Sequence, residues 1–170
     1  MKTLFFRSSA VISDCGQYRY VLRRFFDAGP DDMKRNLLTW IMLNPSVATA
    51  EIDDPTIRRC MNFAASWAYD GITDMNLFAY RSTYPNDLHN VDDPVGPEND
   101  ATIERESASG LVVAAWGVLG TFLDREAKVV SILNRLGVKT MCLGMTKHGR
   151  PKHPLYVAAA TELQPFSVRP

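Results

Sequence analysis

The predicted sheet is built around the segment Leu37-Leu38-Thr39-Trp40-Ile41-Met42-Leu43-Asn44-Pro45-Ser46. An apolar run of this length, bounded by a polar turn, is typical of a strand that is buried on both faces. Pro45 has no amide hydrogen and a fixed φ angle, so it ends the strand and favours an extended conformation at Asn44. We therefore expect Asn44 at the carboxyl end of a central strand, which is where open α/β sheets bind their ligands.

The residues that follow predict a helix and then a repeated alternation of strands and helices. Asp54 is expected to cap the first helix, with Pro55 in its first turn and Gly71 after its end. Four apolar strands separated by helical patterns predict an α/β fold, a four-stranded parallel sheet flanked by helices on both faces. Right-handed crossovers then bring the strand exits to one edge. After residues 37–43, the expected strands are 72–78, 111–116 and 138–143, and the later helices are 100–109 and 122–136.

The N-terminal region predicts a β-hairpin. Two β-prone runs, Thr3–Ile12 and Tyr18–Phe26, are separated by a short segment that contains Asp and Gly. The three arginines of the second run, Arg19, Arg23 and Arg24, are expected on the exposed face of an edge hairpin. We expect one domain over residues 1–170, with the hairpin in residues 1–30 and the main core in residues 37–156.

The composition is that of a globular domain without an extreme charge. The 170 residues are 46% hydrophobic and 22% charged, and the 19 basic residues balance the 19 acidic ones. This balance gives no global attraction to nucleic acid or anionic membranes, although it is compatible with a local basic patch. The three cysteines form no CxxC pair, and no apolar run has the length of a signal peptide or a membrane span. We expect a cytoplasmic protein that has no membrane partner.

Three side chains of the expected loops offer polar chemistry near the first two strands. The amide of Asn44 would hold a water or a substrate carbonyl, or else cap the local backbone. Asp53 is a candidate general base, whereas Asp54 is expected to act only as the helix cap. Asn76 lies in an apolar strand, and a buried Asn must be paired. Its amide would bind the edge of a base or bond to the neighbouring loop.

Aromatic and basic side chains follow the second and the last strands. Phe78 and Tyr80 are possible stacking platforms, although Phe78 also fits the core, and Arg81 is placed to meet a phosphate. His153, held by the adjacent proline, is placed to donate a fixed hydrogen bond. The densest basic cluster would hold a phosphate backbone or simply remain solvated, and it includes Lys147, Arg150 and Lys152. No spacing of His, Cys and carboxylates indicates a metal, and no glycine-rich phosphate loop is present, so no cofactor is expected.

The chain contains a characteristic series of short segments: Met42-Leu43-Asn44-Pro45-Ser46, Asp53-Asp54-Pro55-Thr56-Ile57-Arg58-Arg59, Asn76-Leu77-Phe78-Ala79-Tyr80-Arg81, Asp93-Pro94-Val95-Gly96-Pro97-Glu98-Asn99-Asp100 and His153-Pro154-Leu155-Tyr156. In combination they resemble a family of bacterial and phage proteins that is catalogued as a domain of unknown function. The resemblance extends from about Leu37 to Tyr156 and implies no activity.

The same order of segments is more distantly similar to the uracil-DNA glycosylase superfamily, whose members have a four-stranded parallel sheet flanked by helices. The Leu43-Asn44-Pro45 segment resembles the Asn-Pro form of the first motif in the mismatch-specific branch. This resemblance implies that Asn44 positions the attacking water and that Asn76 binds the base. His153-Pro154 resembles the start of the last motif, but Leu155-Tyr156 replaces the serines and the turn that enters DNA.

The resemblance and the candidate residues lead to one preferred function and two alternatives. The preferred function is a nucleobase-directed enzyme, a DNA glycosylase-like hydrolase that cleaves an N-glycosidic bond in DNA or a nucleotide. In that case His153 stabilises the negative charge on the departing base. The alternatives are a non-catalytic protein that binds nucleic acid or a nucleotide, and a base-modifying transferase on the same scaffold.

Overall fold

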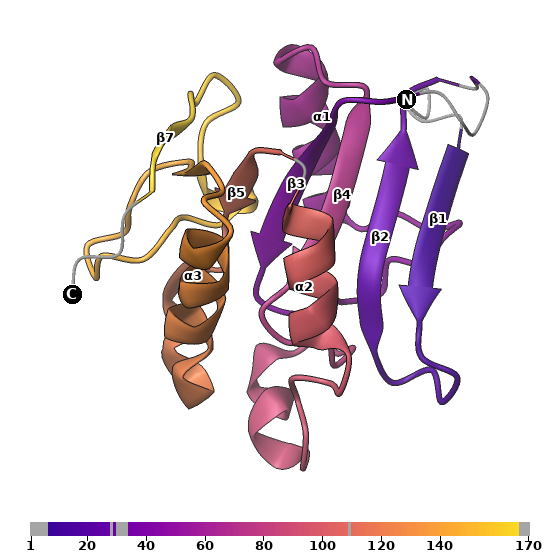
Figure 1. The fold of residues 1–170 in the computed structure, drawn as a ribbon, viewed down its shortest axis with the longest axis vertical. Coiled ribbons are helices and arrows are strands. Elements are labelled where there is room, and N and C mark those ends of the chain that lie inside the picture. Colours follow the sequence, from indigo (N-terminus) through magenta and orange to yellow (C-terminus); the bar gives the residue numbers. More distant parts are fainter. Residues whose placement is uncertain (1–6, 28, 30–33, 109, 167–170) are drawn as a thin grey trace.

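The computed structural model describes residues 7–27, 29, 34–108 and 110–166. Over this part of the chain, seven strands form one mixed sheet in the order β1-β2-β4-β3-β5-β6-β7 (Figure 1). The strands β4, β3, β5 and β6 pair in parallel, whereas β1–β2, β2–β4 and β6–β7 are antiparallel pairs. The strands are β1 Arg7–Ile12, β2 Arg19–Phe25, β3 Leu37–Met42, β4 Gly71–Asn76, β5 Val112–Ala114, β6 Thr140–Cys142 and β7 Gln164–Pro165.

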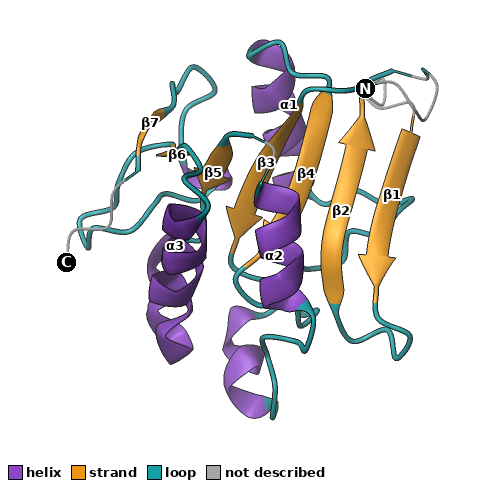
Figure 2. Cartoon of the chain, in the orientation of Figure 1, coloured by secondary structure: helices purple, strands orange, loops and turns teal. Residues whose placement is uncertain are grey.

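Helices cover both faces of this sheet, which confirms the α/β class (Figure 2). Helix α1 (Pro55–Ser66) packs on one face, whereas α2 (Asn99–Ser107) and α3 (Arg125–Arg135) pack on the other. Short 3-10 helices also occur at Pro85–Asn90 (η1), Gly117–Asp124 (η2) and Pro154–Tyr156 (η3). No helix in the described ranges is long and apolar enough to cross a membrane.

Strand β3 lies at the centre of two cores, as its apolar sequence requires. Trp40 is fully buried on the α1 side, where its ring lies 6.2 Å from that of Phe63 and 6.4 Å from that of Trp67. Ile41 points to the opposite side and packs in the cluster that includes Ile132 of α3. Adjacent residues therefore fill different cores, because successive side chains of a strand point to opposite faces.

The prediction of a four-stranded, wholly parallel sheet is wrong for the sheet as a whole. The hairpin strand β2 pairs directly with β4, and its residues are almost all buried, so β1 and β2 extend the sheet rather than stand apart from it. The pairing of β6 with β7 adds a further antiparallel strand that the sequence did not indicate. The beginning of the first run, residues 3–6, lies outside the described residues.

The expected exposed arginines of the hairpin are a second correction. Arg19 and Arg24 are 2% and 0% exposed, because β2 is an interior strand of the sheet. Nε of Arg24 donates to Oδ1 of Asp53 at 2.7 Å, and Nη2 of Arg19 donates to Oδ2 of Asp74 at 2.5 Å. The charges of Arg19 and Arg24 are thus compensated inside the protein, whereas Arg23 stays partly exposed and pairs with Glu106.

The helix predicted over 122–136 begins later, at Arg125. Phe122 is extended, with ψ at 131°, and both Leu123 and Asp124 have a φ of 52°. This left-handed pair breaks the helical path, so the preceding residues form the separate turn η2. The α1 prediction is confirmed, since Asp54 caps that helix by accepting from the Ile57 amide at 2.8 Å.

We predict that Asp53→Asn lowers the free energy of unfolding by about 3 kcal/mol, because it removes the carboxylate partner of a buried guanidinium. Chemical denaturation of the two proteins measures this difference. The control is Glu104→Gln, which breaks the exposed pair with Arg135 and should leave the denaturation midpoint unchanged. Equal midpoints for Asp53→Asn and the parent protein would refute a structural role for the Arg24–Asp53 pair.

Candidate functional site

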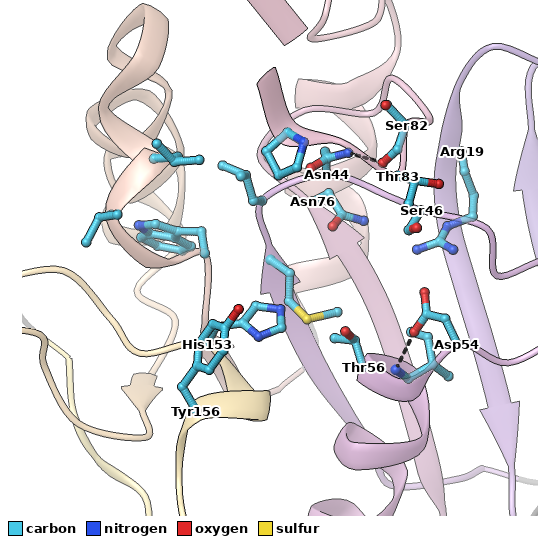
Figure 3. Close-up of a pocket in the computed structure, with 17 residues that line it drawn as sticks. Arg19, Asn44, Ser46, Asp54, Thr56, Asn76, Ser82, Thr83, His153 and Tyr156 are labelled. Atoms are coloured by element: carbon cyan, nitrogen blue, oxygen red, sulfur yellow. Dashed lines mark hydrogen bonds between the residues drawn. The ribbon is translucent and has the colours of Figure 1, made fainter. Parts of the chain in front are cut away.

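A cavity of about 430 Å³ lies beyond the carboxyl ends of β3 and β4. Its lining comes from the exits of these strands, the start of β2, the start of α1, the segment 82–85 and the turns η2 and η3. The cavity brings together Asn44, Asn76 and His153, which are far apart in the sequence. Figure 3 shows these side chains around a shared space, with Arg19 and Asp54 on one side of it and Tyr156 on the other.

Asn44 is fixed by the loop that follows β4. Its Nδ2 donates to the carbonyl oxygen of Ser82 at 2.8 Å and to that of Pro45 at 3.2 Å. The side chain therefore does cap local backbone, which was one of the two expectations for it. Because both contacts use the amide nitrogen, Oδ1 is the side-chain atom of Asn44 that remains available to a ligand or a water.

Asn76 is the last residue of β4 and is 1% exposed. Within the described part of the chain, neither Nδ2 nor Oδ1 completes a hydrogen bond of normal geometry. A buried carboxamide without partners costs roughly 1–3 kcal/mol per unsatisfied group, and such groups in native proteins usually mark a bound water or a ligand. Because Asn76 lines the cavity, its amide is suited to bind a ligand there.

His153 precedes the turn η3 and caps it. Its Nδ1 accepts a hydrogen bond from the Leu155 amide at 3.3 Å, so the neutral ring carries its proton on Nε2. Burial lowers the pKa of His153 below its ordinary value of 6.5, and the negative charge of Asp54 opposes this shift only in part. At neutral pH the side chain is therefore an uncharged imidazole with an Nε2–H donor.

Arg19, which lines the cavity, and its buried partner Asp74 were not predicted as site residues from the sequence. Arg19 donates from Nη1 to the Ala48 carbonyl at 2.9 Å, in addition to its bond with Asp74. Burial raises the pKa of Asp74 to about 7, against the opposing effect of Arg19. Asp54 is the one carboxylate among the described lining residues. The strand pattern contained a signal for Asp74, because residues two apart in a strand share a face and Asn76 was already a candidate.

Other predicted residues lie away from the cavity. Asp53 is bound to Arg24 and does not line it. Phe78 is fully buried in the core, where its ring lies 5.6 Å from that of Phe122. Tyr80 and Arg81 line a neighbouring hollow of about 500 Å³. This hollow shares three lining residues with the main cavity, and these are Ser46, Ser82 and Thr83.

The predicted phosphate-binding residues are not gathered in one place. Arg81 donates from Nη1 to the Gly16 carbonyl at 3.0 Å. Arg150 donates to Glu126 at 2.9 Å, and this glutamate also accepts from the indole of Trp116. Lys147 is exposed and Lys152 is half-buried, and neither belongs to the described lining of the cavity. The described residues contain no group of three or more His, Cys, Asp and Glu side chains arranged to hold a metal ion.

A family model described as "Protein of unknown function (DUF1643)" matches residues 19–155. The chain belongs to the DUF1643 family. The matched region begins at Arg19, earlier than the expected start near Leu37, and it spans the cavity from Arg19 through His153. No curated protein and no solved structure matches this DUF1643 chain.

We predict that His153 titrates with a midpoint below 6.5, because burial disfavours the charged ring. A two-dimensional ¹H–¹⁵N spectrum of the imidazoles measures both the midpoint and the position of the proton. The Nε2–H form should predominate at neutral pH, as the bond from the Leu155 amide to Nδ1 requires. A midpoint above 6.5, or a proton on Nδ1, would contradict the described geometry.

Proposed function

We propose that this protein acts on a nucleobase and cleaves the N-glycosidic bond that joins the base to a sugar, in DNA or in a nucleotide. The proposal rests mainly on one observation, the buried carboxamide of Asn76 that faces the cavity without partners. A carboxamide has a donor and an acceptor in one plane, and the edge of a base presents complementary groups in one plane. Binding of a base would satisfy Asn76 at little cost, because the strand already holds it in place.

Asn44 supplies the second part of the proposed site. Since its amide nitrogen is bound to the Ser82 and Pro45 carbonyls, Oδ1 is held in a fixed direction. An oxygen in that position accepts a hydrogen bond from a water and orients it toward the sugar carbon. Asp54 lines the same cavity and would take a proton from this water, a role that the sequence had suggested for Asp53.

His153 supplies the third part, the stabilisation of the departing base. When the glycosidic bond breaks with both of its electrons going to the base, negative charge develops on the base. The neutral imidazole donates a hydrogen bond from Nε2 to the atom that gains this charge. A neutral imidazole suits this task, because its fixed N–H donor stabilises the developing charge without any prior change in the protonation of the ring.

The parallel pairing of four strands and the sequence motifs also support this proposal. Parallel pairing of β4, β3, β5 and β6 is the arrangement of strands expected for a uracil-DNA glycosylase-like scaffold. Fold alone does not fix activity, so the argument depends on the side chains in the cavity. Tyr156 is 83% exposed beside His153. In the sequence resemblance, Leu155-Tyr156 replaces the serines and the turn with which that superfamily enters DNA. In this protein Tyr156 offers an aromatic surface on which a base can stack.

The neighbouring hollow is placed to receive the part of the substrate that extends beyond the base. Arg81 would meet a phosphate there and Tyr80 would stack against a flanking group. Lys147 and Lys152 would add attraction to a nucleic-acid strand from outside the cavity. Arg150 contributes less to phosphate binding, because Glu126 already neutralises it.

We predict that the protein releases free base from at least one oligonucleotide in a panel that carries uracil, hypoxanthine and other altered bases. Asn44→Ala and His153→Ala should each lower the rate of release by roughly 100-fold, because they remove the water-orienting oxygen and the donor to the departing base. Chromatography of the released base measures the rate.

The matched controls are Asn90→Ala and His148→Ala, which remove an exposed amide and an exposed imidazole outside the described lining of the cavity. Both should retain the full rate. Salt-dependent binding of the panel without release of any base would refute hydrolysis and support the non-catalytic binding function instead. The engaged amide nitrogen of Asn44 is the observation that favours this alternative. A change in the mass of the base, without its release, would identify a base-modifying transferase.

A further inference from the structure

Arg19 and Asn76, which line the cavity, and Asp74, which is bonded to Arg19, are buried polar side chains, and each has at least one polar atom without a hydrogen bond in the described structure. Asp74 and Asn76 are two residues apart on β4, so they share a face of the strand, and they are 0% and 1% exposed. Oδ2 of Asp74 accepts from Arg19, whereas Oδ1 completes no hydrogen bond within the described structure. The carboxamide of Asn76 lies close enough to lower the pKa of Asp74, although it completes no bond of normal geometry.

This arrangement allows two alternative hydrogen bonds between the side chains of Asp74 and Asn76. An ionised Asp74 only accepts, so it pairs with Nδ2 of Asn76 and leaves the amide oxygen toward the cavity. A protonated Asp74 donates from Oδ1, so it pairs with the amide oxygen of Asn76 and leaves the N–H groups toward the cavity. Because the carboxamide is planar, the two states present opposite hydrogen-bonding groups to a ligand.

We propose that Asp74 is a positioning residue that sets the orientation of the Asn76 carboxamide, and that its protonation selects which group of that amide meets the ligand. The choice of base that follows rests on the proposed function, whereas the coupling of the two side chains does not. Asn76 would then accept from N–H groups of a base when Asp74 is ionised, and donate to carbonyl or ring-nitrogen acceptors when Asp74 is protonated.

The surroundings of Asp74 place this change near neutral pH. Burial raises its pKa to about 7, and the positive charges of Arg19 and Arg24 on β2 oppose that effect. Asp54, which precedes α1, raises the pKa further, and the thiol of Cys60 in α1 faces the same carboxyl and stays protonated through burial. Because this pKa is about 7, the protonated form of Asp74 is expected to predominate at acidic pH and the ionised form at alkaline pH.

The test of the coupling follows the side-chain amide of Asn76 by ¹H–¹⁵N NMR in the unmodified protein between about pH 5 and pH 9. We expect its two proton signals to shift together with one midpoint near 7. The Asp74→Asn variant should abolish the shift, and His153→Gln should leave it in place, because the imidazole titrates separately. Signals that do not move with pH in the unmodified protein would overturn the proposal, and this result requires no variant to fold.

The consequence for base selection is tested with uridine and cytidine. At two adjacent ring positions uridine has an N–H donor and a carbonyl acceptor, whereas cytidine has a ring-nitrogen acceptor and an amino donor. Both nucleosides stay uncharged between about pH 6 and pH 8. The ratio of their dissociation constants should change at least about tenfold over this range, since one hydrogen bond is inverted. In Asp74→Asn the ratio should stay constant. This variant retains His153, so a constant ratio would show that the imidazole is not the source of the change. A constant ratio in the unmodified protein would refute the selection.

Nucleoside binding with the expected change, but without release of base from any oligonucleotide, would refute the proposed hydrolysis and leave the positioning role supported. If neither nucleoside binds at either pH, the selection of a base is refuted, and the amide titration decides the positioning role.

Discussion

The buried ion pair between Arg19 and Asp74 connects the two halves of the sheet. Arg19 begins β2, which runs antiparallel to β4, and Asp74 lies in β4, which begins the parallel set. Burying two charges is costly unless they are paired and hydrogen-bonded, so β2 has few alternative positions once Arg19 is inside. The carbonyl of Ala48 accepts a further bond from Arg19 and ties the loop after β3 to the same pair. The polar side of the cavity is therefore shaped by an interaction that also fixes the position of β2.

This pair also explains why so many polar atoms near the cavity lack partners. Its geometry is set by two strands, so Arg19 and Asp74 cannot move to satisfy their remaining atoms without disturbing the sheet. Arg19 Nε, Asp74 Oδ1 and both polar atoms of Asn76 complete no hydrogen bond in the described structure. A site that is held rigid and left incomplete is suited to recognise a ligand, because binding then costs little reorganisation.

Local sequence patterns predicted the elements around the cavity better than the partners of its charged residues. The apolar run before Asn44-Pro45 and the Asp54-Pro55 start of α1 predicted β3 and its following helix, because strand burial and helix capping are local effects. The exits of β3 and β4 placed Asn44 and Asn76 at the same edge of the sheet, and His153 lines the same cavity. The arginines of β2 were assigned to the surface because their counter-ions, Asp74 and Asp53, are 55 and 29 residues away. Long-range compensation of this kind leaves no periodic pattern in the sequence, and neither does the two-residue strand β7.

The charge of the cavity depends on which of its groups are ionised at neutral pH. Burial lowers the pKa of His153 and raises that of Asp74, so both side chains favour their neutral forms relative to an exposed group. When Asp74 is protonated, the charge of Arg19 is left without its carboxylate partner, and the cavity becomes more positive. When Asp74 is ionised, that charge is compensated, and the rest of the described lining consists mainly of uncharged groups, with Asp54 as its one carboxylate. An uncharged planar ligand fits the second state, whereas a ligand that gains negative charge as it reacts is stabilised by the first. In the function proposed here, a single buried carboxyl group, Asp74, would link the recognition of a neutral base to the stabilisation of its anion.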